Sequence, residues 1–82
     1  MGLTLVTRED CELCEVMQAE LRSLSGVLSL PALRLVDVDA DPQLQRRYGL
    51  KVPVLLLDGA LVCHGRLQAD ELRRVLARRV PS

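Results

Sequence analysis

The sequence predicts an α/β domain in which a four-stranded mixed sheet is flanked by three helices. In the first half of the chain, short apolar runs alternate with stretches of helical periodicity. In the second half, an Asp-Gly pair joins two apolar runs, and a helical pattern closes the chain. The expected order is therefore β-α-β-α-β-β-α. With 82 residues and no internal repeat, we expect a single domain over residues 1–82.

The first strand is expected at Leu3–Val6, which is apolar on both faces and therefore belongs in the middle of the sheet. After the second cysteine, the apolar residues Met17, Leu21 and Leu24 recur at intervals of three and four, which is typical of an amphipathic helix. Gly26 is suited to end this helix as a left-handed cap.

The second strand is expected at Leu33–Val38, and the helix that connects it to the first strand makes a parallel, right-handed unit. Asp41-Pro42 predicts the start of a second helix, because Asp is a good N-cap and Pro fits the first turn. Leu44 and Tyr48 share a face of this short helix, and Gly49 ends it.

The hairpin is the clearest local signal in the chain. Asp58-Gly59 joins Val54–Leu57 to Ala60–Cys63, and Asp-Gly suits the type I′ turn that hairpins prefer. These two strands are therefore expected to be antiparallel. The last helix begins with Asp70-Glu71 and ends with Arg78-Arg79, a charge order that matches the helix dipole. Its apolar positions are Leu72, Val75, Leu76 and Val80.

Composition argues against several classes of function. Hydrophobic residues make up 49% of the chain, but Tyr48 is the sole aromatic, so no stacking platform for single-stranded nucleic acid is available. A formal net charge of zero also argues against a nucleic-acid partner. No apolar run approaches the roughly 20 residues that span a bilayer, and the first residues do not resemble a secretory leader. Three cysteines are a poor disulfide framework, which favours a reducing cytoplasm.

Cys11-Glu12-Leu13-Cys14 is the motif to which we attribute the chemistry. At a strand-to-helix junction, Cys11 lies where free N–H groups and the helix dipole favour a thiolate, so Cys11 is the expected nucleophile. Cys14 lies one turn further on the same face, which is compatible with a reversible disulfide. The alternatives are a pair of small core or surface residues without redox chemistry, and half of a metal site. Zinc prefers four ligands, and Cys63 and His64 are the only other soft candidates in the sequence.

The whole pattern resembles the thioredoxin-like superfamily, and glutaredoxin-like proteins most closely. The resemblance covers nearly the entire chain and includes Val36-Asp37-Val38-Asp39 and Tyr48-Gly49-Leu50-Lys51-Val52-Pro53. It implies that the bond between Val52 and Pro53 is cis, that Pro53 faces the cysteines, and that the backbone of Val52 pairs with a substrate chain.

Two cations are candidates for substrate binding. Arg8 stands where glutaredoxins often carry a lysine near the thiolate and the glutathione carboxylate, and Lys51 precedes Val52-Pro53. We expect at least one of them to support an anionic ligand or the thiolate, because cations lower the pKa of a thiol. Cys63 is expected to fill the core of the last strand near the same edge as the motif, and His64 is expected to have no catalytic role.

The chain also departs from the family pattern. Glu12-Leu13 replaces the usual Pro-Tyr between the cysteines, and Leu5 stands where thioredoxins carry a buried Asp. The segment His64-Gly65-Arg66-Leu67-Gln68 replaces the Gly-Gly turn that captures the amino end of glutathione. These departures argue against glutathione recognition, although glutathione stays a candidate reductant.

The expected function is thiol–disulfide exchange by a monomer with no tightly bound cofactor. Cys11 attacks a substrate disulfide, and Cys14 resolves the mixed disulfide. The substrate would be a protein or glutathione-type disulfide, and the electron donor a reductase or glutathione. The alternative is a non-enzymatic thioredoxin-fold module that binds a metal, an iron–sulfur cluster or a partner protein through its cysteine face.

Overall fold

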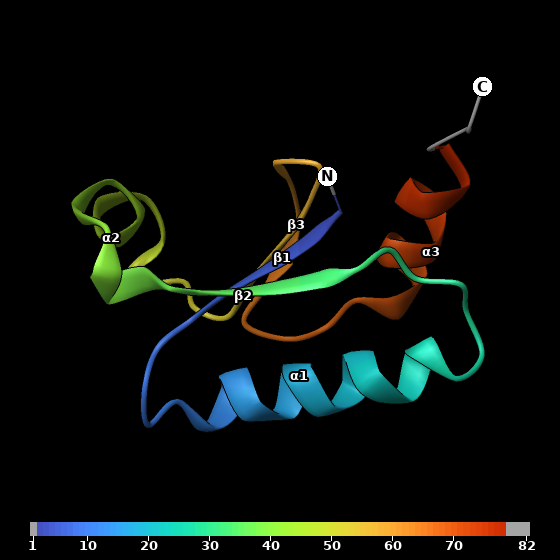
Figure 1. Ribbon diagram of the computed structural model, residues 1–82, viewed down its shortest axis with the longest axis horizontal. Coiled ribbons are helices and arrows are strands. Elements are labelled where there is room, and N and C mark those ends of the chain that lie inside the picture. The colour runs from blue at the N-terminus through green and yellow to red at the C-terminus, as the bar shows by residue number, and fades with distance from the viewer. Residues whose placement is uncertain (1, 79–82) are drawn as a thin grey trace.

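The structure, a computed structural model, describes residues 2–78 (Figure 1). Its elements follow the predicted order, with one short 3-10 turn added after the second strand. The strands are β1 (Leu3–Thr7), β2 (Leu33–Asp37), β3 (Val54–Leu57) and β4 (Ala60–His64). The helices are α1 (Glu12–Ser25), α2 (Pro42–Tyr48) and α3 (Ala69–Arg78), and the 3-10 turn η1 is Val38–Ala40. The predicted α/β class is confirmed.

The four strands form one sheet in the order β2-β1-β3-β4. β1 is parallel to β2 and antiparallel to β3, and β3 is antiparallel to β4, so the sheet is mixed as predicted. The prediction that the first strand is central is also confirmed. Val6 pairs with Val54, which in turn pairs with His64, so the carboxyl ends of β1 and β4 lie at the same edge of the sheet.

Helices cover both faces of this sheet, and alternate side chains of β1 and β3 pack into two separate cores. One core contains Leu5 and Leu55, together with residues of α1 and α3. The other contains Val6 and Val54, with α2 packed against it. All four residues of β3 are buried, which explains its unbroken apolar sequence. Within residues 2–78, no helix combines the length and apolar character that crossing a bilayer requires.

The predicted hairpin turn is confirmed. Asp58 and Gly59 have φ values of 51° and 86°, the pair of left-handed conformations that a type I′ turn requires. Asp41 caps α2 as predicted, because its carboxylate accepts a hydrogen bond from the backbone N–H of Gln43 at 2.8 Å.

Four boundary predictions were wrong. The first and last strands each extend one residue further than predicted, to Thr7 and His64. Gly26 is not left-handed: its φ is −79°, and α1 ends in right-handed turns in which the N–H groups of Val27 and Leu28 reach the Leu24 carbonyl. The second strand ends at Asp37 and not at Val38, because the Asp37 carboxylate accepts a bond from the N–H of Asp39 and begins the 3-10 turn. Arg79 and Val80, predicted for the last helix, lie outside the described residues.

Candidate functional site

Cys11 and Cys14 are joined by a disulfide at the start of α1, with their Cα atoms 5.2 Å apart. Cys11 is the N-cap of the helix and has an extended backbone, and its Sγ accepts a hydrogen bond from the Cys14 N–H at 3.2 Å. The strand-to-helix junction therefore places Cys11 where the sequence predicted it, at the positive end of the helix dipole.

The two sulfurs differ in access. Cys14 is 3% exposed, whereas Cys11 is half-buried. An incoming group therefore has access to Cys11 and not to Cys14. This asymmetry suits a pair in which one cysteine meets the substrate and the other acts from inside the fold.

The loop between α2 and β3 contains the other predicted binding residues. The peptide bond between Val52 and Pro53 is cis. The Pro53 carbonyl accepts a bond from the Gly65 N–H at 2.8 Å, and the Lys51 N–H donates to the Tyr48 carbonyl at 2.8 Å. The backbone of Val52 makes no loop or turn hydrogen bond with the rest of residues 2–78. Contact of Pro53 with the cysteines and ligand binding by Lys51, whose side chain is exposed, stay predictions.

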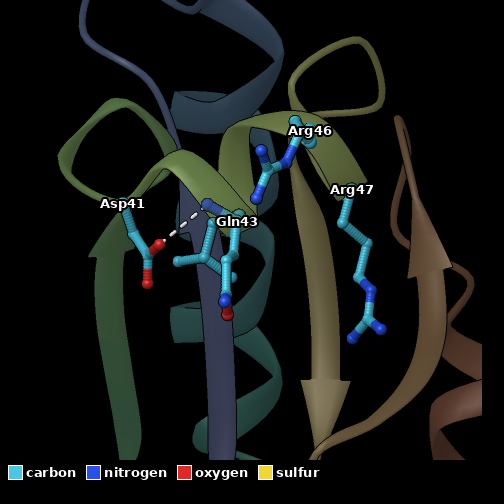
Figure 2. A pocket seen from close by; sticks show the side chains of 5 residues that line it. Asp41, Gln43, Arg46 and Arg47 are labelled. Atoms are coloured by element: carbon cyan, nitrogen blue, oxygen red, sulfur yellow. Dashed lines mark hydrogen bonds between the residues drawn. The ribbon is translucent and has the colours of Figure 1, made fainter.

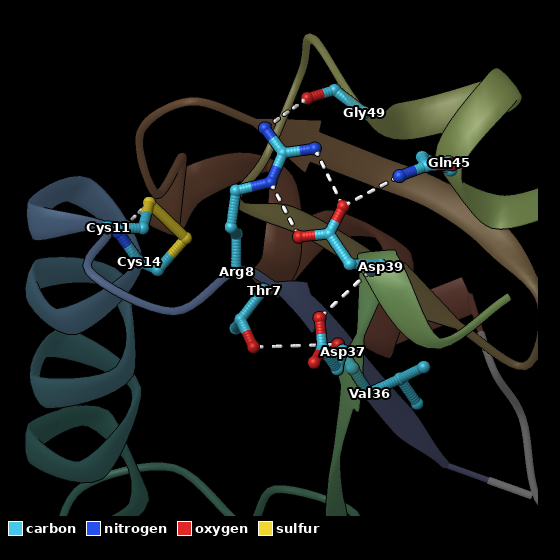
Figure 3. Close-up of polar contacts among 9 residues, drawn as sticks. All are labelled: Thr7, Arg8, Cys11, Cys14, Val36, Asp37, Asp39, Gln45 and Gly49. Atoms are coloured by element: carbon cyan, nitrogen blue, oxygen red, sulfur yellow. Dashed lines mark hydrogen bonds and ion pairs between the residues drawn. A yellow bond between two sulfur atoms is a disulfide. The ribbon is translucent and has the colours of Figure 1, made fainter. Parts of the chain in front are cut away.

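Arg8 has partners that the sequence pattern did not indicate (Figure 3). Its guanidinium forms a two-pronged ion pair with Asp39 and also donates to the Gly49 carbonyl. The hydrogen bond to Asp39 is the main reason why the pKa of Arg8 is raised, and the bond from Arg8 lowers the pKa of Asp39. The binding of an anionic ligand by Arg8 stays a prediction. Its observed contacts lie within the chain.

Cys63 fills the core on the helix-α1 side of the sheet, as predicted, and is 7% exposed. Burial raises the pKa of its thiol, which makes Cys63 a poor nucleophile. His64 follows it at the exposed end of β4. The structure thus places Cys63 at the same edge of the sheet as the motif but inside the core.

Four carboxylates surround the motif on exposed positions: Glu9, Asp10, Glu12 and Glu15. Among residues 2–78, the ion pairs join Arg8 to Asp39, Arg73 to Asp70 and Arg74 to Glu71, so none of these four carboxylates is paired. The surface beside the disulfide is therefore acidic.

Of two surface hollows, one borders the cysteine motif and the other does not. The larger one, 540 Å³, is lined by Asp41, Gln43, Leu44, Arg46 and Arg47 of α2 and its N-cap, and contains none of the predicted site residues (Figure 2). The smaller one, 160 Å³, lies along α1 and begins at Leu13, between the two cysteines. It is lined by Leu13, Val16, Met17, Glu20, Gly65 and Arg66. Leu13 and Val16 are 50% and 45% exposed, so this hollow has an apolar wall open to solvent.

In the part of the chain that the structure describes, no group of three or more His, Cys, Asp or Glu side chains is arranged to hold a metal ion. The cysteine pair would need ligands from another molecule to complete a tetrahedral site.

Comparison with known proteins gives matches over most of this chain. A family model described as "Glutaredoxin-like domain (DUF836)" matches residues 2–77. An uncharacterized protein of Mycobacterium tuberculosis, Rv0508, is 33% identical over 78 residues, covering 90% of this chain and 80% of that protein.

Solved structures of other proteins are similar to this chain in sequence and in fold. Protein Ne2328 from Nitrosomonas europaea is 33% identical with a TM-score of 0.82, over 90% of this chain and 88% of that one. Protein XcR50 from X. campestris is 33% identical with a TM-score of 0.69, over 98% of this chain and 100% of that one. Two thioredoxins and a glutaredoxin from Populus match at 14–18% identity with TM-scores of 0.57–0.60, which shows that the fold is thioredoxin-like.

Proposed function

This chain belongs to the glutaredoxin-like domain family, and from that premise we propose that it is a thiol–disulfide oxidoreductase that reduces disulfides in polypeptides. The observation that carries the proposal is the Cys11–Cys14 disulfide at the N-terminus of α1, with Cys11 accessible and Cys14 buried. A purely structural disulfide has no need of one accessible sulfur at a helix N-terminus, whereas an exchange reaction requires it.

The reaction begins with the reduced pair. The Cys11 thiolate attacks one sulfur of the substrate disulfide, which forms a mixed disulfide and releases the other substrate sulfur as a thiolate that takes up a proton. Cys14 then loses its proton and attacks Cys11 Sγ, which releases the second substrate thiol. The substrate gains two electrons and two protons, and the cysteine pair becomes the disulfide seen in the structure.

Two features support a polypeptide as the substrate. The backbone of Val52, which makes no loop or turn hydrogen bond within residues 2–78, is suited to pair with an extended chain. The hollow along α1 offers the apolar surfaces of Leu13 and Val16 to a side chain next to the substrate cysteine. The unpaired carboxylates around the motif disfavour an anionic tripeptide such as glutathione as the preferred substrate.

Regeneration of the dithiol needs a thiol or dithiol reductant from outside the chain. The test is turnover of a peptide disulfide with either glutathione or a thioredoxin reductase system as the electron source. Wild type is compared with Cys11→Ser, and Cys63→Ala is the matched control because Cys63 is buried. We expect turnover in wild type and the control and none in Cys11→Ser. Turnover that survives Cys11→Ser, or that is absent from wild type with both reductants, would contradict the proposal.

A further inference from the structure

Arg8 connects three segments of the chain that are far apart in sequence. Its Nε donates to Asp39 Oδ2 at 3.0 Å, its Nη2 to Asp39 Oδ1 at 3.2 Å, and its Nη1 to the Gly49 carbonyl at 3.0 Å. Each of the three guanidinium nitrogens therefore has an acceptor. Figure 3 shows the guanidinium turned toward both partners.

Asp39 is itself held in place. Gln45 donates from its side-chain amide to Asp39 Oδ1 at 2.9 Å, and the backbone N–H of Asp39 donates to Asp37 Oδ1 at 2.9 Å. Gln45 of α2 thus holds the carboxylate that receives the Arg8 fork, and Asp37 holds the backbone of Asp39. A fixed acceptor allows a bidentate guanidinium contact to define an orientation as well as a distance.

The contacts of Arg8 and Asp39 lie between two loops that the proposed reaction uses. Arg8 comes three residues before Cys11, and Gly49 comes four residues before Pro53. The Arg8–Gly49 bond therefore joins the loop that carries the reactive cysteine to the loop that carries the cis bond. The far end of the second loop is tied by the Gly65 N–H to the Pro53 carbonyl at 2.8 Å. The second loop is consequently anchored at both ends.

Gly49 leaves little room for adjustment in this arrangement. A Cβ at this position would overlap the Gln45 carbonyl oxygen and would lie 3.5 Å from Arg8 Nη2. The backbone of Gly49 is therefore packed between the end of α2 and the guanidinium.

We propose that Arg8 is a positioning residue. Through Asp39 and Gly49 it fixes the position of the loop of residues 49–53 relative to Cys11, so that a bound peptide disulfide lies in line with Cys11 Sγ. This inference rests on the proposed exchange reaction and deepens it. The Arg8–Asp39 pair is 37% and 43% exposed at its side chains, and exposed ion pairs add little to stability. Its main effect is therefore expected on geometry, to which exchange rates are sensitive because a small misplacement of reacting groups slows a reaction severely.

The experiment compares two rates for each reduced protein, since they respond differently to geometry. The first is the second-order rate of exchange with an extended peptide disulfide, which needs the 49–53 loop. The second is the rate of Cys11 alkylation by iodoacetamide, a small neutral reagent that does not. The variants are Arg8→Lys, which keeps the charge but loses the fork, and Asp39→Asn, which keeps the shape but loses the charge. Arg74→Gln is the matched control, because Arg74 forms a similar exposed pair with Glu71 on α3.

If Arg8 is a positioning residue, Arg8→Lys and Asp39→Asn should slow peptide exchange on the order of tenfold while alkylation changes less than about twofold. The control should change neither rate. A fall in both rates by the same factor would show that Arg8 acts on the thiolate or on folding in general, and would overturn the inference. Equal exchange rates in all variants would overturn it too, and leave the proposed function standing. No exchange by wild type despite normal alkylation would overturn the proposed function and this inference with it.

Discussion

After reduction of the disulfide, Cys11 should react with iodoacetamide at neutral pH at least about tenfold faster than Cys63, and the structure indicates that burial supplies most of the difference. The start of α1 favours a Cys11 thiolate and the neighbouring carboxylates disfavour it, so ionisation alone separates the rates of the two cysteines only modestly. A more stable thiolate is also a weaker nucleophile, which reduces that separation further.

Burial of Cys63 supplies most of the difference in labelling rate. Cys63 is 7% exposed, packs in the core with Leu5 and Leu55, and has a raised pKa because of that burial. It can react only after β4 opens locally, and each 1.4 kcal/mol of opening free energy slows labelling about tenfold. Time-resolved labelling followed by mass spectrometry of the three cysteine peptides gives the rates. In denaturing urea Cys11 no longer lies at a helix N-terminus and Cys63 is no longer buried, so the labelling rates of the two cysteines should become equal. Labelling of Cys63 as fast as Cys11 in the folded protein would refute the reasoning.

Three further predictions concern charge and packing. The carboxylates around the motif should disfavour the Cys11 thiolate, so the wild-type potential should lie nearer to about −270 mV than to the −200 to −230 mV of glutaredoxins, and Glu12→Lys should raise it. Equilibration with glutathione buffers measures both potentials. An unchanged potential in the variant would show that these carboxylates do not set the potential of the cysteine pair. The pKa of Asp39 is lowered in the folded state, so its contribution to stability is present above about pH 3.9 and is lost as the pH falls through the lower folded value. Asp39→Asn should therefore flatten the acid limb of a urea-unfolding series, and parallel limbs would contradict this. Gly49→Ala should cost about 1–3 kcal/mol of unfolding free energy, because its Cβ would overlap the Gln45 carbonyl; a variant as stable as wild type would mean that the loop adjusts freely.

Local patterns account for the parts of the molecule that the sequence predicted. Asp58-Gly59 and Asp41-Pro42 act through their own backbone and near neighbours, so the hairpin and the start of α2 could be read without knowing the rest of the fold. The cysteine motif was equally local, because its strand-to-helix context lies within a few residues. Gly26 shows the weakness of this approach: a residue that permits a left-handed cap does not require one.

The partners of Arg8 could not be found in this way. Asp39 is 31 residues away and Gly49 is 41 residues away, and neither spacing corresponds to a periodicity of a helix or a strand. Charge pairing at such separations depends on the crossover that places η1 and the end of α2 beside the end of β1. The sequence did contain one usable signal. Asp37 ends a strand that is parallel to the first, and Asp39 lies two residues further on, so both lie near the edge of the sheet where Arg8 follows β1.

Because Cys11 is more exposed than Cys14, the two sulfurs of the disulfide are not equally open to attack. An external thiol that restores the reduced state has access to Cys11 Sγ and not to Cys14. Substrate and reductant must therefore occupy the same surface in turn, and neither can bind while the other is attached. Replacement of the inner cysteine by Ser would leave no group to expel the bound molecule. A Cys14→Ser protein should for that reason form a stable mixed disulfide on Cys11 with the polypeptide disulfides that it attacks, and with a donor when the donor is supplied in its disulfide form.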